Sequence, residues 1–564
     1  MRLASLIRRV IPRERHTPPD GGLRRDSHVV ARPATVLLLA TLIIATTVLA
    51  GMSRGMHQKV SYGPESEQAA ISIALSEMIY RLRLGYVGFA SVNTKLKEIW
   101  NRGAKGPHDP ILIENSSNGE LMNEAIRVAA SLGPQPIRYI GDRSLITMFY
   151  DDLGQVDFNK LGFRLFGLNI ESRYYLFFTL LALSALIFVL TFHDNIHALV
   201  VLLCALFAFY VELHLAIFSP YVPTYAGMRH GSTLGLIPMW YFVFLTGRRM
   251  SPTALAGAVA QLAILLLAWR IRGSTAWMFV FIWAVAIAKA ALRLPRRSSD
   301  ARWLLRLGRE AVRGAAQWPL IMLLVGIAVQ AVYLRVAPHP AYARDDFLPY
   351  HGLWHSAYLG LKFSPELMSP RVQAAFQKYG ASDTLGHYAA LDYADRIRLM
   401  PWKDMDSPLP AGFLSPWTNE FKPRMHDDLM RGAVLEALTR RPLETFRLYL
   451  YKKPVAICQT LYGALFDVPS LRWPWLVLAG GVGVLLLMLI FDKPPAAPAG
   501  TVRPSLLALS ATIVAALPNL WAYPGPHASI DMVLTFVAFM PLALGLGAMA
   551  AMWRMLSSLH AVAQ

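Results

Sequence analysis

The chain has 564 residues, of which 55% are hydrophobic and 16% are charged, and its mean hydropathy is +0.38. Because soluble domains carry roughly one quarter charged residues, this composition excludes an ordinary soluble protein and indicates a polytopic membrane protein. Lys and Arg total 55 against 36 acidic residues. Much of this excess lies beside apolar segments, where topology and anionic lipid explain it without a nucleic-acid partner. With two cysteines and no Walker-type motif, the chain offers neither a disulfide framework nor a built-in ATPase.

The N-terminal region is predicted to hold a membrane anchor. A basic tail, 1–33, precedes an apolar run at 34–52 that is long enough to cross a bilayer core of about 30 Å. The basic flank predicts a cytoplasmic N-terminus. Small residues near Ala50 would suit signal-peptide cleavage, but the apolar run is too long for a signal peptide, so we expect an uncleaved helix. Residues 53–173 then form a first extracytoplasmic block.

Six further apolar segments follow within residues 174–335. They lie near 174–192, 198–217, 233–247, 252–269, 275–291 and 318–335. The connection 292–317 carries seven arginines and is therefore predicted to be cytoplasmic. Counting spans from the N-terminus places Arg270 and Arg272 on the outer side, against the same rule. This pair is the weakest point of the predicted topology.

A second polar block, 336–471, is expected on the same side as the first. Three more transmembrane helices occupy 472–552, near 472–491, 505–522 and 530–552. Residues 553–564 form a cytoplasmic tail. The expected fold is an all-α polytopic membrane protein with about ten transmembrane helices, two mainly helical extracytoplasmic blocks and both termini in the cytoplasm. Its short cytoplasmic loops direct any chemistry to the outer face or to the membrane itself.

The end of the first block carries a family resemblance. Residues 149–178 read FYDDLGQVDFNKLGFRLFGLNIESRYYLFF, so that Asp151 and Asp152 stand just before an aromatic, amphipathic lead-in to the second span. This stretch, with a large loop after the first span and crowded helices behind it, resembles the GT-C superfamily of multi-span membrane glycosyltransferases over about residues 34–250. In that superfamily the first outer loop carries acidic residues near the membrane, and its lead-in often contains a Phe-Gly turn, as FRLFGLNIES does here.

The resemblance implies transfer of a sugar from a polyprenyl-phosphate donor to a glycan acceptor. A carboxylate would take the proton of the acceptor hydroxyl, and the catalytic candidates are Glu65, Glu67, Asp151 and Asp152. The glutamates also fit the first turn of a predicted helix, and the aspartates also fit a loop. Cations or a metal must stabilise the leaving phosphate. The cofactor is unknown, with a divalent cation as one option, and no metal ligands are assigned.

The stretch RDDFLPYHGLWHSAYLGLKF, residues 344–363, supplies candidate substrate contacts. Aromatic and hydrogen-bonding side chains suit a sugar, although a solvated domain surface and an interfacial aromatic belt also explain them. HGLWH has the spacing of a metal-ligand pair but lacks the glutamate of a zinc protease helix. The candidates are Asp345, Asp346, His351, Trp354 and His355.

Three further groups of charged residues lie in or beside predicted spans. Glu212 and His214 lie within the third span, where ionisable groups usually face a cavity or a partner. Arg229 and His230 precede the next span, as phosphate contacts or as simple anchors. The stretch LTRRPLETFRLYLYKKP offers either a cradle for lipid phosphates or a solvated helix face. Its basic residues are Arg440, Arg441, Arg447, Lys452 and Lys453.

Two other functional classes stay open. A lipid or solute transporter would show repeat symmetry and broken spans in both halves, and no such symmetry is visible in the sequence. A non-catalytic component of a polysaccharide assembly or export system would tolerate the loss of every acidic candidate. The Ala- and Arg-rich composition favours the bacterial inner membrane for all three classes.

Overall fold

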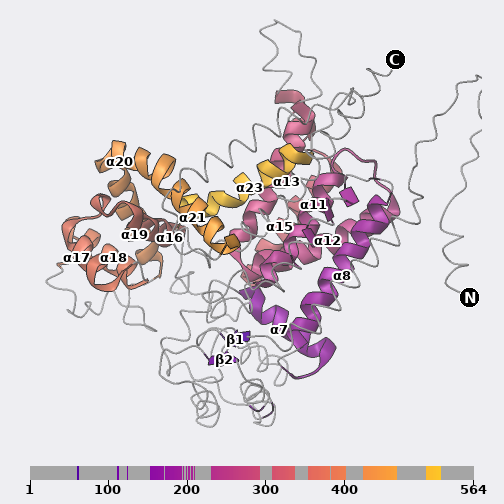
Figure 1. Ribbon diagram of the computed structural model, residues 1–564, viewed down its shortest axis with the longest axis horizontal. Helices are drawn as coiled ribbons and strands as arrows, with labels where there is room; N and C mark the ends of the chain where they lie inside the picture. The colour runs from indigo at the N-terminus through magenta and orange to yellow at the C-terminus, as the bar shows by residue number, and fades with distance from the viewer. Residues whose placement is uncertain are drawn as a thin grey trace, which may run out of the picture.

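The computed structural model describes most of residues 153–193, 230–291, 308–336, 353–401, 423–466 and 504–522, with strands at 60–62 and 111–113 and isolated positions at 124, 127 and between 195 and 209. These residues are predominantly helical, as predicted (Figure 1). The two short strands, β1 (Val60–Tyr62) and β2 (Ile111–Ile113), pair antiparallel with Ser61 opposite Leu112.

Apolar helices form a bundle at the centre of the molecule (Figure 1). They are α8 (Ser172–Phe192), α11 (Leu236–Leu245), α12 (Pro252–Ile271), α13 (Trp277–Ala291), α15 (Trp318–Val336) and α23 (Pro504–Trp521). Among the described residues, three segments are long and apolar enough to cross a membrane, namely Tyr175–Phe192, Pro252–Ile271 and Gly273–Ala290. A fourth is added if the bent pair Gly308–Gly314 and Trp318–Tyr333 is counted as one span.

The predicted spans agree with the bundle wherever the structure describes them. The spans predicted near 174–192, 233–247, 252–269, 275–291, 318–335 and 505–522 coincide with the six helices of the bundle. The spans predicted at 34–52, 472–491 and 530–552, and most of 198–217, lie outside the described residues. The membrane character of the chain is thus supported, whereas the count of ten remains a prediction.

Aromatic packing and internal hydrogen bonds hold the bundle together. Phe188 and Phe192 of α8 pack on Tyr241 of α11, with ring centroids 6.1 and 5.2 Å apart. Gln261 of α12 and Ser184 of α8 exchange two hydrogen bonds, from Ser184 Oγ to Gln261 Oε1 at 2.6 Å and from Gln261 Nε2 to the Ser184 carbonyl at 2.7 Å. Since a bilayer core offers polar groups no water, such bonds must be made between helices.

One amphipathic helix, α7 (Leu153–Phe166), folds back against the start of α8. Gly167 makes the turn with φ +93°, a conformation that favours glycine. The Ser172 hydroxyl donates to the Gly167 carbonyl at 2.6 Å, and the Ser172 backbone N–H donates to Asn169 Oδ1 at 3.1 Å. The second bond satisfies one backbone N–H group at the N-terminus of α8, and the first ties this end of the helix to the turn. The Phe-Gly pair of the predicted lead-in therefore does form a turn.

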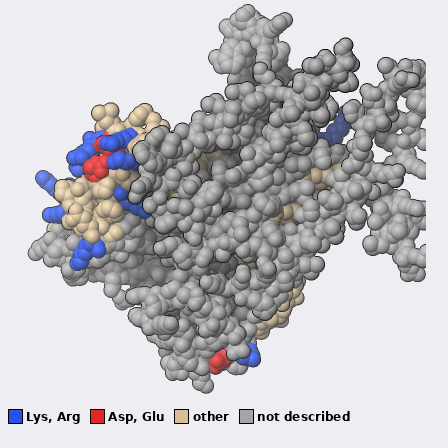
Figure 2. All heavy atoms as spheres, viewed as in Figure 1, with Lys and Arg blue, Asp and Glu red and all other residues tan. Residues whose placement is uncertain are grey.

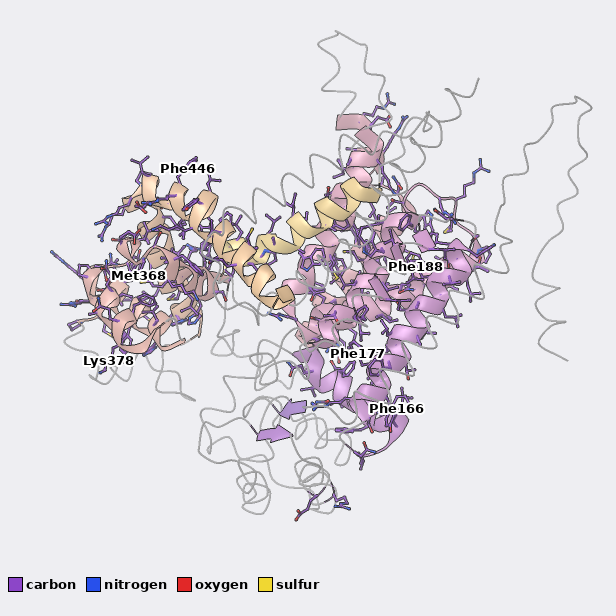
Figure 3. All side chains as sticks on the ribbon, viewed as in Figure 1. Phe166, Phe177, Phe188, Met368, Lys378 and Phe446 are labelled. Atoms are coloured by element: carbon purple, nitrogen blue, oxygen red, sulfur yellow. The ribbon has the colours of Figure 1, made fainter. Side chains whose placement is uncertain are left out.

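The described residues between 353 and 452 build a second helical unit with its own core, at the left of Figure 1. It contains α16 (Leu353–Leu359), η4 (Gly360–Phe363), η5 (Pro365–Leu367), α17 (Pro370–Tyr379), α18 (Asp383–Arg396), α19 (Pro423–Arg440), α20 (Pro442–Arg447) and the π-helical turn η7 (Leu448–Lys452). Met368 belongs to this core and lies inside the unit (Figure 3). The helical character predicted for the second block thus appears in its described part.

Two helices connect the second unit to the bundle. Helix α21 (Lys453–Phe466) continues directly from η7, and its Ile457 packs in the core of the bundle. At the C-terminal end of α23, Trp521 donates from Nε1 to the Leu353 carbonyl at 3.3 Å and packs edge-on against Trp354 at 5.6 Å. The second unit is therefore joined to the bundle by packed side chains as well as by the chain.

Candidate functional site

Most of the predicted site residues lie outside the described part of the chain. They are Glu65, Glu67, Asp151, Asp152, Glu212, His214, Arg229, Asp345, Asp346 and His351. The structure does describe the segments that directly follow two of these groups, because α7 begins one residue after Asp152 and the 3₁₀ helix η1 begins at His230.

Both of these segments meet at the C-terminal end of α12. A Cβ atom on Gly154 would lie 2.3 Å from the Arg270 carbonyl carbon and from the Ile271 nitrogen, so the first turn of α7 touches the backbone there. In η1 (His230–Gly235), a Cβ on Gly231 would lie 2.7 Å from Cδ1 of Ile271. The segments that follow these two predicted groups therefore both contact the end of α12.

An ion pair fixes α7 to this end of α12. Arg270 donates from Nη2 to a carboxylate oxygen of Asp157 on α7. Lys160, one turn along α7, lies 2.9 Å from the other oxygen of the same carboxylate. The Arg270 guanidinium also covers the ring of Tyr333, near the end of α15, at 4.1 Å. Since Arg270 and Asp157 are only 14% and 19% exposed, solvent screens this pair less than a surface pair.

More polar side chains are buried around the same helix ends. Arg173, in the first turn of α8, is 3% exposed, and Asn159 of α7 is fully buried. Within the described part of the chain, neither amide atom of Asn159 has a hydrogen-bond partner, and the same holds for Ser274 Oγ and Trp277 Nε1. An unsatisfied buried polar group costs about 1–3 kcal/mol. Such groups are typical of places where water or a polar ligand binds.

We call this set the α7–α12 polar cluster. Its members lie on α7, on the start of α8 and on the segment from the end of α12 to the start of α13, and they are Asp157, Asn159, Lys160, Arg173, Arg270, Arg272, Ser274 and Trp277. Four of the eight are cations and one is an anion, so the cluster is strongly cationic. Partial burial lowers the local dielectric and strengthens its attraction for an anion.

None of these residues is among the site residues predicted from the sequence. Asp157 lies in the quoted lead-in, but its partner is 113 residues away and no periodicity links the two. The available signal was the charge anomaly of Arg270 and Arg272, which had been treated as a difficulty for the topology. Among the described residues, no group of three or more His, Cys, Asp or Glu side chains is placed to hold a metal ion.

In the second unit, His355 and Trp354 take part in internal packing. His355 is 1% exposed, and its Nδ1 lies 3.2 Å from Nε2 of His426 on α19, which is 2% exposed. Gly386 of α18 provides the space, because a Cβ there would lie 2.2 Å from the His355 ring. Trp354 packs on Trp521. The substrate-binding role predicted for these two residues remains a prediction.

The five basic residues predicted as a lipid-phosphate cradle do not all converge on one point, although Arg447 and Lys452 each lie 3.4 Å from an oxygen of the Glu444 carboxylate. Arg440 pairs with Glu436 at 2.7 Å and Arg447 with Glu444 at 3.4 Å. Lys452 pairs with Glu366 and donates to Ser364 Oγ at 2.8 Å. The side chain of Arg441 is exposed.

Lys453, the last of the five, is fully buried where the second unit meets the bundle. Its Nζ donates to the Trp521 carbonyl at 2.8 Å and lies 4.6 Å above the Tyr449 ring. Burial lowers the pKa of Lys453 to about 7. This lysine therefore has a structural contact at the end of α23 rather than a lipid-facing position.

Comparisons of the whole chain with family models, with curated proteins and with solved structures give no match, and no family is assigned to it.

Proposed function

We propose that this chain is a multi-span membrane glycosyltransferase of GT-C-like layout, which transfers a sugar from a polyprenyl-phosphate donor to a cell-envelope or secreted glycan. The observation that supports this proposal is the α7–α12 polar cluster. It is a partly buried, cationic site at the ends of the apolar helices, where a lipid-linked phosphate can reach it without leaving the membrane.

The arginines of the cluster suit the leaving group of the reaction. Arg270 is held by Asp157 on one side and by the Tyr333 ring on the other, so its orientation is fixed before a ligand arrives. Arg272, two residues after Arg270, and Arg173, at the start of α8, are further arginines on the elements that adjoin α7. Guanidinium groups bind phosphate oxygens with paired hydrogen bonds, and they stabilise charge that develops on a departing phosphate.

The reaction then needs one base. The acceptor oxygen bonds to the anomeric carbon of the sugar, the bond from that carbon to the phosphate oxygen breaks, and polyprenyl phosphate leaves with the electron pair. A carboxylate takes the acceptor proton. Asp151 and Asp152 are our first candidates because they directly precede α7 in the chain, and Glu65 and Glu67 are the alternatives. A divalent cation is a further way to neutralise the phosphate.

The location belongs to the same proposal. A polyprenyl-phosphate donor and a multi-pass chain imply a bacterial inner membrane, with ten spans, cytoplasmic termini and the α7–α12 polar cluster on the extracytoplasmic side. In this arrangement the basic 292–317 connection lies in the cytoplasm, in agreement with the positive-inside rule.

Binding of the carrier lipid to the full chain in nanodiscs tests the proposal. We expect undecaprenyl or decaprenyl phosphate to raise the thermal unfolding temperature of the wild type saturably. Arg272→Gln should weaken this stabilisation at least tenfold in apparent affinity, whereas Arg164→Gln, an exposed position on α7, should leave it unchanged. Asp151→Asn and Asp152→Asn should still bind the lipid but lose sugar transfer.

Failure to bind would contradict the proposal. If an intact, folded chain shows no stabilisation by either polyprenyl phosphate, the donor is not a lipid-linked sugar. A non-catalytic role in polysaccharide assembly or export would then be the better explanation. Equal binding by Arg272→Gln and the wild type would remove the α7–α12 polar cluster as the site.

A further inference from the structure

The helix that leads from the second unit into the bundle carries an exposed apolar ridge. Leu443, Phe446 and Leu450 are 85%, 66% and 62% exposed, and Tyr451 beside them is 54% exposed. The first three are spaced by three and four residues, so they share one face of the helix. Leu443 is the most exposed large apolar side chain among the described residues. Figure 3 shows Phe446 at the outer edge of α20.

Basic side chains surround this ridge. From Arg440 to Tyr451 the chain has three arginines and one acidic residue, Glu444, which leaves an excess of two positive charges. The side chains of Arg440 and Arg447 are 51% and 60% exposed, and Arg441 is exposed too. Figure 2 shows Lys and Arg along the rim of this unit next to uncharged side chains. Exposed apolar and basic residues together are typical of helices that lie in a membrane interface.

The position of the ridge along the chain agrees with such a role. Helix α20, the turn η7 and helix α21 follow one another without a break from Pro442 to Phe466. Ile457 on this continuous helix packs in the core of the apolar bundle. Seven residues separate it from Leu450, which is about 10 Å along a helix, so the ridge begins close to the apolar bundle.

We propose that α20 and η7 form an interfacial helix that seats the second unit on the membrane surface. Leu443, Phe446 and Leu450 enter the boundary between headgroups and acyl chains, and Arg440, Arg441 and Arg447 bind anionic headgroups. A second copy of the chain is a poorer occupant, because a twofold contact on the ridge would bring the same arginines of both copies together. This inference does not depend on the proposed glycosyltransferase activity.

Site-directed spin labelling of the full chain tests the proposal. Both native cysteines are replaced by serine, and a nitroxide is attached to Phe446→Cys in nanodiscs that contain 30% phosphatidylglycerol. Accessibility to oxygen, which concentrates in lipid, is compared with accessibility to a water-soluble nickel chelate. Lys378→Cys is the matched control, because Lys378 lies on the opposite edge of the second unit from Phe446 (Figure 3). Thermal unfolding checks that each labelled variant is folded.

At position 446 we expect the ratio of oxygen to nickel accessibility to be at least fivefold higher than at position 378. Replacing Arg440, Arg441 and Arg447 by Gln should lower the ratio at 446 in anionic nanodiscs only. Equal ratios at the two positions would overturn the proposal, because the ridge would then lie in water. Protection from both reagents in detergent would also overturn it, since a protein contact would then cover the ridge.

Discussion

Substitution of Gly154 by alanine tests how α7 is seated on α12. A Cβ at this position would lie 2.3 Å from the Arg270 carbonyl carbon and the Ile271 nitrogen, and 2.7 Å from the Arg270 Cβ. Ordinary contact begins near 3.4 Å, so the two helices must separate by roughly 1 Å. The atoms in the way are mostly backbone, which cannot turn aside as a flexible side chain can. Asp157, three residues further along α7, would move with the helix and lose its contact with Arg270.

The expected loss of stability can be bounded. Overpacking costs about 1–3 kcal/mol, and replacing glycine by alanine in a helix returns up to about 1 kcal/mol. We therefore expect Gly154→Ala to lower the free energy of unfolding by about 1–2 kcal/mol. In a chain of this size that corresponds to a fall of a few degrees in the thermal midpoint. Polyprenyl phosphate should also stabilise the variant less than the wild type.

Gly273→Ala is the matched control for this experiment. Gly273 lies two residues beyond Ile271, and a Cβ on it would meet nothing within 4 Å. Thermal unfolding in nanodiscs should therefore leave this variant within about 0.5 kcal/mol of the wild type. If Gly154→Ala and Gly273→Ala behave alike, α7 does not rest on the end of α12 and the α7–α12 polar cluster is not assembled as described.

Three further predictions concern the bundle and the second unit. Gln261→Leu removes both hydrogen bonds to Ser184 and should lower the free energy of unfolding by about 1 kcal/mol, measured by thermal unfolding. The double variant Ser184→Ala plus Gln261→Leu should be no less stable than Gln261→Leu alone. Burial, with His355 nearby, lowers the pKa of His387 to about 4 from an ordinary 6.5. The unfolded chain thus binds the proton first, and the second unit should lose about 3 kcal/mol of stability as pH falls from 6.5 to 4, measured by hydrogen exchange and absent in His387→Gln. Burial also lowers the pKa of Lys453 to about 7, below its value in the unfolded chain. The wild type therefore gains stability as pH rises from 7 toward 10, whereas Lys453→Met has no such gain. The thermal midpoint of Lys453→Met relative to the wild type should be highest below pH 7 and decline toward pH 10.

The positions of the bundle helices were predictable because the bilayer sets both their length and their composition. The span predicted at 252–269 is α12, Pro252–Ile271, and the span predicted at 174–192 is α8, Ser172–Phe192. Serine and proline at the start of α12 mark its first turn, where Ser251 caps the helix by accepting a hydrogen bond from the Ala254 N–H. Local signals of this kind need no knowledge of the rest of the fold.

Contacts between distant segments were not predictable from the same signals. Helical periodicity shows which face of a helix is apolar, but it does not show which helix covers that face. His355 had been paired with His351, four residues earlier, whereas the structure gives it His426, 71 residues later on another helix. The sequence also does not distinguish Lys453, fully buried at the end of α23, from its exposed basic neighbours in the stretch 438–454.

The charge anomaly at the end of α12 was the most informative single feature of the sequence. An arginine pair on the outer side breaks the positive-inside rule, so either the topology or the rule fails at that point. The ion pair of Arg270 with Asp157 places the end of α12 on the same side of the bundle as α7 and the start of α8, as the predicted topology requires, and the assignment of that side to the outer face stays a prediction. A local function of the positive charge then explains why these arginines depart from the positive-inside rule. Binding of an anion beside α7 is such a function. Arginines that depart from a predicted topology, such as Arg270 and Arg272 here, are therefore the first residues to test as a binding site.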